Sequence, residues 1–302
     1  MNEPTPLNNI KHPLKPLLHF LLIWFLCFLS FNVLGAILVG YLLDVDPGSL
    51  NFESLAIDEN IWALKVMQIF VSAGSFLLPP LVYIWFKKKS VKKYFGFQKG
   101  IQFKLLLGTV VIVFLSGPVV YWLLQVNQQM NFPDFMGGLE QYLQSMEQDN
   151  ENILIRLLSM ETIGQLLLNL FMVALLPGIG EELLFRGVLQ KLLGRLYKNP
   201  HLGIIGAALI FSFIHFQFYG FLPRMALGVL FGYLYYWSGN LWYPIIAHVV
   251  HNGAQVIMVY SMGADFTEQD LESIGQFSPF MIMIATVFLI ISLARFQFMS
   301  KH

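Results

Sequence analysis

The chain has 302 residues, of which 56% are hydrophobic, 15% are aromatic and only 12% are charged. Soluble domains carry about 25% charged residues, so this composition excludes an ordinary soluble protein and predicts an integral membrane protein. The 18 basic and 18 acidic residues balance, and no run of either sign indicates a nucleic acid as partner. Cys27 is the single cysteine, which excludes an intrachain disulfide.

Eight apolar stretches are candidates for membrane-spanning helices. We predict spans at residues 17–43, 61–86, 103–125, 163–190, 202–219, 224–238, 241–261 and 279–296. The fifth and sixth are short, and the sixth is the least secure because Arg224 directly follows Pro223 at its start. The first is longer than the core of a signal peptide and has no small-residue cleavage site, which favours a retained helix.

The charges between these spans alternate in sign. Lysines and arginines gather before the first span, between the second and third, between the fourth and fifth, and after the eighth, whereas acids gather in the other connections. Because basic loops mark the cytoplasmic side of a membrane protein, both termini are expected there. We therefore predict an all-α, polytopic membrane helix bundle of about eight transmembrane helices, with residues 1–302 forming a single integral membrane domain.

Three other patterns predict local structure. Pro79-Pro80 should kink the second span. Gly228 and Gly232 form a small-xxx-small pattern, which lets two helices approach closely. In the long loop before the fourth span, residues 139–160 are amphipathic and are expected to form a helix on the membrane surface.

One stretch breaks the two-sided sorting of charges. Residues 180–187, with the sequence GEELLFRG, place three ionisable groups in an apolar run, where an unpaired charge costs on the order of 3 kcal/mol. Glu182 and Arg186 lie four residues apart and should neutralise each other on one helix face, which leaves Glu181 with a free carboxylate. Pro177-Gly178 predict a break before them. The alternative is a helix end whose charged side chains reach out to water.

Later spans carry few polar residues. His215 shares a helix face with Phe211 in the fifth span, and His248 shares one with Asn252 in the seventh. At about 1.5 Å of rise per residue, these groups and Glu181 can meet in one layer, in the cytoplasmic half or near mid-membrane. Hydrocarbon offers polar groups no partner except one another, so we expect the three helices to converge around Glu181.

Together, three motifs on successive polar helices resemble those of the CPBP family, the CAAX-processing and bacteriocin-processing (Abi) intramembrane glutamic endopeptidases, which include the type II CAAX prenyl endopeptidases. The motifs are Glu181-Glu182-x-x-x-Arg186, Phe211-x-x-x-His215 and His248-x-x-x-Asn252. Residues 166–256 carry the resemblance, within an expected catalytic core at 163–261. It implies a multi-pass protein of a bacterial cytoplasmic membrane that hydrolyses a peptide bond in a membrane-anchored peptide or protein, with a CAAX-like or lipidated C-terminus as one candidate substrate.

The resemblance implies catalytic roles for four residues, and their chemistry is suitable. Glu181, with His215, would hold and deprotonate a water molecule that attacks the scissile carbonyl. His248 and Asn252 would donate hydrogen bonds to the oxyanion that forms.

The neighbouring motif residues are expected to support these four. Glu182 and Arg186 would brace the helix that carries Glu181, and Phe211 would pack the site. His251 lies on a different face of its helix from His248 and is expected to be structural.

Two kinds of alternative remain open. Within the same family pattern, Glu181, His215 and His248 could bind zinc, with water in the fourth position. We favour a site without a cofactor, because no H-E-x-x-H pair is present and Asn252 suits an oxyanion better than zinc. Outside catalysis, the same residues could line a proton path in a transporter, or bind a peptide in a bacteriocin-immunity or scaffold protein.

Overall fold

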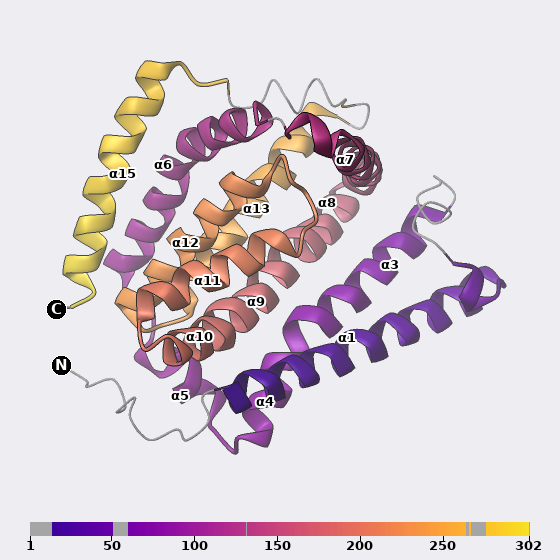
Figure 1. The fold of residues 1–302 in the computed structure, drawn as a ribbon, viewed down its shortest axis with the longest axis horizontal. Coiled ribbons are helices and arrows are strands. Elements are labelled where there is room, and N and C mark those ends of the chain that lie inside the picture. The colour runs from indigo at the N-terminus through magenta and orange to yellow at the C-terminus, as the bar shows by residue number, and fades with distance from the viewer. Residues whose placement is uncertain (1–13, 51–59, 131, 264–265, 267–275, 302) are drawn as a thin grey trace.

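The computed structural model describes residues 14–50, 60–130, 132–263, 266 and 276–301, and every regular element in these ranges is a helix. Most of the long helices share one diagonal direction in Figure 1 and pack side by side. The protein is therefore an all-α membrane helix bundle, as its composition and apolar runs predict.

Six of the eight predicted spans are helices long and apolar enough to cross a membrane. Many apolar side chains of the first and last of them are exposed, as expected for helices that are solvated by lipid. The six spans are α1 (Leu14–Leu43), α3 to α4 (Ile61–Phe86), α6 (Phe103–Gln128), α8 to α10 (Ile163–Leu196), α13 (Trp242–Met262) and α15 (Pro279–Met299).

The two spans predicted to be short are α11 (Pro200–Phe213) and α12 (Phe221–Ser238). The predicted fifth span extends to residue 219, but α11 has only 14 residues and ends at Phe213. His215 therefore lies in the turn that follows the helix, and not inside it. At about 1.5 Å per residue, α11 is about 21 Å long, which is shorter than the roughly 30 Å hydrocarbon core of a bilayer.

π-helical turns precede the prolines of the second and fourth spans. In the second span, η3 (Ala73–Leu77) precedes α4 (Leu78–Phe86), whose first turn contains Pro79-Pro80. In the fourth, η6 (Leu170–Leu175) precedes α9 (Leu176–Glu182), which contains Pro177. Proline cannot donate a backbone hydrogen bond, and a wider turn before it accommodates the ring. The predicted break at Pro177-Gly178 is wrong, because the helix continues to Leu196.

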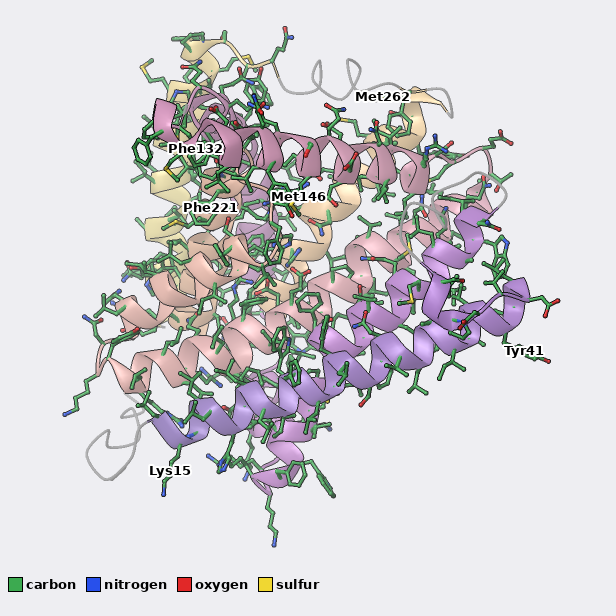
Figure 2. The ribbon with its side chains drawn as sticks, turned by 45° about the vertical axis from the view of Figure 1, so that its right-hand side comes forward. Lys15, Tyr41, Phe132, Met146, Phe221 and Met262 are labelled. Atoms are coloured by element: carbon green, nitrogen blue, oxygen red, sulfur yellow. The ribbon has the colours of Figure 1, made fainter. Side chains whose placement is uncertain are left out.

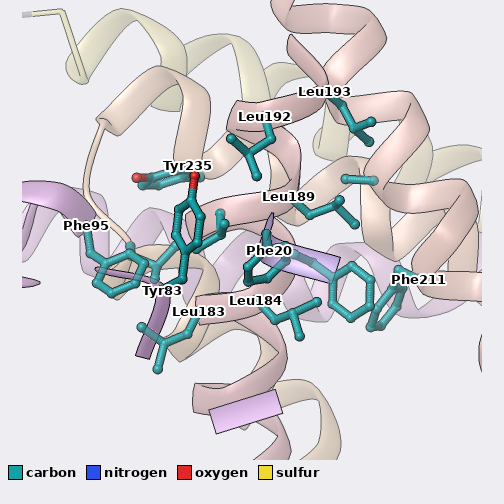
Figure 3. Close-up of a cluster of buried hydrophobic side chains, with 14 of the residues drawn as sticks. Phe20, Tyr83, Phe95, Leu183, Leu184, Leu189, Leu192, Leu193, Phe211 and Tyr235 are labelled. Carbon is teal, nitrogen blue, oxygen red and sulfur yellow. The ribbon is translucent and has the colours of Figure 1, made fainter. Parts of the chain in front are cut away.

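The fourth span is the central helix of the bundle. It consists of α8 (Ile163–Asn169), η6, α9, η7 (Leu183–Leu189) and α10 (Gln190–Leu196). Every residue from 181 to 190 is buried. Figure 3 shows an apolar cluster in which leucines of η7 and α10 contact aromatic side chains from other helices, among them Phe20 of α1 and Tyr83 of α4.

The basic segments of the chain gather at one end of the bundle. Near the start of α1, Phe20 packs against Tyr83 near the end of α4, with ring centroids 5.3 Å apart. A Cβ atom on Gly108, near the start of α6, would lie 3.8 Å from Met299 at the end of α15. This arrangement agrees with the alternation of charge along the sequence. That this end faces the cytoplasm stays a prediction.

The other end of the bundle is crossed by α7 (Gly137–Leu158), on which Met146 is labelled in Figure 2. Leu157 and Leu158 at its C-terminal end are buried, whereas most of its residues are exposed or half-buried. The amphipathic helix predicted over residues 139–160 is thus present, and it covers this end of the bundle.

The glycine pattern in α12 provides a close contact with α11. A Cβ atom on Gly228 would lie 2.9 Å from the Cβ of Ala208, and one on Gly232 would lie 2.7 Å from Cγ2 of Ile204. Both distances are too short for a larger residue, so the two helices pack at the separation that the small-xxx-small pattern predicts.

Candidate active site

The candidate site lies in the middle of the fourth span, where α9 ends and η7 begins. Glu181 is 7% exposed, Glu182 is 0% exposed and Arg186 is 1% exposed. These side chains therefore lie inside the bundle. The alternative of a helix end whose charges reach out to water is wrong.

Arg186 and Glu182 form the ion pair that their spacing predicts. Nη1 of Arg186 lies 2.7 Å from Oε1 of Glu182, and Nη2 donates to the backbone oxygen of Gly228 at 3.1 Å. The guanidinium also lies 4.7 Å from the ring centroid of Phe211 and 5.5 Å from that of Phe231. A buried charge is tolerated when it is paired and hydrogen-bonded, and these contacts satisfy Arg186 from several helices.

His248 of α13 connects the two glutamates. Its Nδ1 lies 2.8 Å from Oε1 of Glu182, and its Nε2 lies 3.8 Å from Oε2 of Glu181. Since the Glu182 carboxylate accepts the hydrogen bond, Nδ1 carries the proton, and Nε2 is the nitrogen that faces Glu181. Glu182 thus contacts both Arg186 and His248, which leaves Glu181 as the acid not held in the ion pair.

His215 lies close to this cluster, in the turn after α11. Its Nδ1 lies 2.7 Å from the backbone oxygen of Phe211. The Phe211 ring is a neighbour of both histidines, with its centroid 5.0 Å from that of His215 and 6.2 Å from that of His248. Because a backbone carbonyl only accepts hydrogen bonds, the proton of neutral His215 is on Nδ1, and Nε2 can accept one.

Asn252 lies one helical turn beyond His248 on α13. Its side-chain amide donates to the backbone oxygen of Val173 in η6 at 3.0 Å, so it joins α13 to the fourth span. The oxyanion pair expected from His248 and Asn252 is therefore not seen as two free donors, because each side chain already contacts the fourth span. His251 lies 2.9 Å from Gln255, away from the glutamates.

A further charged residue near Glu181 is Arg224, at the start of α12. It lies within electrostatic range of Glu181 and of Glu147 on α7, and its side chain donates to that of Gln217. Sequence reasoning placed Arg224 only at a span end. One sequence signal could have indicated that Arg224 lies near the site: it is a charged residue at the start of an apolar run, directly after Pro223.

Glu147 joins α7 to the turn that carries His215. Its two carboxylate oxygens accept from the backbone nitrogen of Tyr219 at 3.1 and 3.2 Å. Burial raises the pKa of the Glu147 carboxyl above its ordinary value, although these hydrogen bonds oppose the shift. No local sequence pattern indicates this contact, because it depends on where α7 crosses the bundle.

The zinc alternative requires three donors that point to one position. Within the described ranges, no group of three or more His, Cys, Asp or Glu side chains could hold a metal ion. Glu181 and His248 lie together, and Nδ1 of His215 is bonded to the Phe211 backbone, which leaves its Nε2. A site without zinc stays a prediction, and no chemical step below depends on a metal.

Comparison with known proteins gives a family match for the central part of the chain. Residues 163–254 match the family described as type II CAAX prenyl endopeptidase Rce1-like. This region extends from α8 into α13 and carries the motif residues of the fourth, fifth and seventh predicted spans. No solved structure matches the chain.

Two curated proteins of Bacillus subtilis (strain 168) are similar to parts of the chain. The protein named "Uncharacterized protein YpbD" is 36% identical over 86 residues, which are 27% of this chain and 41% of that protein. The protein named "Putative membrane peptidase YdiL" is 27% identical over 135 residues, which are 44% of this chain and 53% of that protein. The chain thus spans about half the length of the curated relatives it matches, and its residues 163–254 are similar to the Rce1-like family of type II CAAX prenyl endopeptidases.

Proposed function

We propose that this protein is an intramembrane endopeptidase in which Glu181 is the general base. The observation that carries the proposal is the division of labour between two adjacent glutamates. Glu182 is held by Arg186 and His248 at 2.7 and 2.8 Å, whereas Glu181 lies 3.8 Å from His248 outside that ion pair. A buried carboxylate that is not committed to a structural pair is available to take a proton.

The first step is the activation of water. The 3.8 Å between Glu181 Oε2 and His248 Nε2 is too long for a direct hydrogen bond, so one water molecule can contact both atoms. Glu181 takes a proton from this water as its oxygen attacks the scissile carbonyl carbon. We assign His215 as a further acceptor for this water, because its Nε2 remains after Nδ1 has bonded the Phe211 backbone.

The second step is the stabilisation of the oxyanion and the loss of the amine. As the water oxygen bonds to carbon, the carbonyl oxygen becomes negative. We assign as its donors the second amide hydrogen of Asn252 and the Nε2–H of His248 in its imidazolium form, in which both ring nitrogens carry protons. Glu182 would support a positive charge on His248 through its 2.8 Å contact. The C–N bond then breaks, and the proton held by Glu181 passes to the leaving nitrogen.

The substrate proposed here is a peptide or protein anchored in the membrane. The site is buried in a membrane bundle, so a peptide bond reaches it most readily from a segment already held in or at the lipid. The family description supports a CAAX-like or lipidated C-terminus as the substrate class. The bacterial relatives support a bacterial cytoplasmic membrane as the location.

The test compares membrane peptides by mass spectrometry in cells that produce the wild type or Glu181→Gln. We expect the variant to fold and to lose about 10²- to 10⁴-fold in cleavage rate, as for removal of a general base. Glu161→Gln is a matched control, because Glu161 is an exposed glutamate of the loop before α8. Normal processing by Glu181→Gln would show that Glu181 is not the base.

The same preparations distinguish the alternatives. A transporter would give flux across sealed vesicles and no new peptide ends, and a peptide-binding immunity or scaffold protein would keep its protection in Glu181→Gln. A zinc enzyme would lose activity to a chelator and regain it when zinc is added. Each of these results would contradict the proposed metal-free peptidase.

A further inference from the structure

A second feature of the molecule is an open cavity of about 460 Å³ at the basic end of the bundle, and four cations line it. In the part of the chain that the structure describes, none of the four forms an ion pair with a carboxylate. The lining residues come from the loop after α4, from α5 (Val91–Phe95) and from α10, and they are Lys89, Ser90, Lys93, Tyr94, Lys191 and Arg195.

Lys191 is held in this cavity by a carbonyl and by aromatic faces. Its Nζ donates to the backbone oxygen of Tyr94, and it lies 4.3 Å from the ring centroid of Tyr94 and 5.1 Å from that of Tyr235. Burial raises the pKa of Tyr94 to about 12, so its hydroxyl stays neutral and supplies no negative charge. The ammonium is therefore fixed in place without an acidic partner.

The cations of this cavity repel one another. Lys191 lies within electrostatic range of both Arg195 and Lys89. Like charges that are held together by the fold destabilise it, and an anion bound between them would offset the repulsion. The cavity is thus complementary to a negatively charged group from outside the described chain.

The size and donors of the cavity favour a phosphate. A volume of about 460 Å³ is in the range of small-molecule sites. Arg195 offers a planar fork of donors that suits phosphate oxygens, and the lysines offer point charges. The Ser90 hydroxyl also lines the cavity, and a hydroxyl can donate to a phosphate oxygen.

The surroundings of the cavity favour lipid as the source of this phosphate. Trp85 is 72% exposed and Phe86 is 62% exposed, at the end of α4 that leads into the cavity. Exposed aromatic residues at helix ends lie at the depth of lipid headgroups, and basic pockets between membrane helices bind anionic headgroups. We propose that this cavity binds the phosphate of an anionic phospholipid headgroup.

The test uses the full chain in detergent micelles with added phosphatidylglycerol, phosphatidylcholine or inorganic phosphate. Bound lipid is measured by native mass spectrometry, and stability by the midpoint of thermal unfolding. We expect phosphatidylglycerol, and not phosphatidylcholine, to be retained and to raise the midpoint. The double variant Lys93→Gln with Arg195→Gln should bind phosphatidylglycerol about tenfold more weakly.

The control is Lys88→Gln with Lys92→Gln, which removes the same charge from exposed positions outside the cavity. It should bind phosphatidylglycerol as the wild type does. Equal binding by the cavity variant and the wild type, or equal loss in both double variants, would overturn the proposal. Stabilisation by inorganic phosphate alone, with no lipid retained, would overturn lipid as the source. None of these readouts depends on peptide cleavage.

Discussion

Two cations lie on the same central helix, the buried Arg186 and the half-buried Lys191, and the structure accommodates them in different ways. Arg186 is paired with Glu182 at 2.7 Å and bonded to the backbone of Gly228. Lys191, farther along the helix, contacts a backbone carbonyl and aromatic rings, and its charged neighbours are also cations. The first cluster is balanced within the chain, whereas the second keeps a net positive charge. A balanced cluster can position reacting groups, and an unbalanced one indicates an external anion.

The largest expected effect comes from breaking the balanced cluster. Arg186→Met would leave Glu182 buried beside His248 without its cation, which should destabilise the protein by about 3–5 kcal/mol. The measurement is the free energy of unfolding in mild detergent. The double variant Arg186→Met with Glu182→Gln should lose less, because it leaves no uncompensated charge. A single variant as stable as the wild type would show that the ion pair does not stabilise the fold.

An intermediate loss of stability is expected from a change at Gly228, where α12 packs against α11 and the Gly228 backbone oxygen bonds Arg186. In Gly228→Ala, the new Cβ would lie 2.9 Å from the Cβ and 3.1 Å from the Cα of Ala208, and overpacking of this kind costs about 1–3 kcal/mol. Gly117→Ala is the control, because no atom lies within 4 Å of its new Cβ. The unfolding midpoints of the two variants should differ, and equal midpoints would mean that α11 and α12 can separate freely.

The smallest effect is expected in the unbalanced cluster. Lys191→Met removes one hydrogen bond and its cation–π contacts, but it also removes a half-buried charge that like charges repel. These changes oppose one another, so the free energy of unfolding should change by only about 1 kcal/mol. The comparison with Arg186→Met under identical conditions is the measurement. A loss as large as that of Arg186→Met would remove the distinction between the two clusters.

Much of the fold could be predicted because hydrocarbon allows few arrangements. Apolar runs and the alternation of basic and acidic loops gave the eight helical segments, and the spacing of Gly228 and Gly232 gave the close contact of α11 with α12. The π-helical turns could not be predicted, since a wider turn depends on how neighbouring helices accept the shifted side chains. The end of α11 at Phe213 could not be predicted either. It goes with a local backbone conformation, since Phe216 in the following turn has a φ of 50°.

The site was partly predictable for the same reason. Glu182 and Arg186 at i and i+4 were expected to pair, and His248 was expected near them because hydrocarbon offers polar groups no partner except one another. Which glutamate His248 contacts more closely depends on the rotation of α13 about its axis, which spacing does not fix. The proximity of Arg224 and Glu147 depends on α7, which lies far away in sequence.

The short α11 has a consequence for the surrounding bilayer. With 14 residues it is about 21 Å long, about 9 Å shorter than the hydrocarbon layer. Such hydrophobic mismatch is relieved when the membrane thins locally or when polar chain ends sink below the headgroups. Either response lowers the water boundary on the side of the bundle where α11 ends, so His215 would be within reach of hydration from that side while Glu182 stays dry.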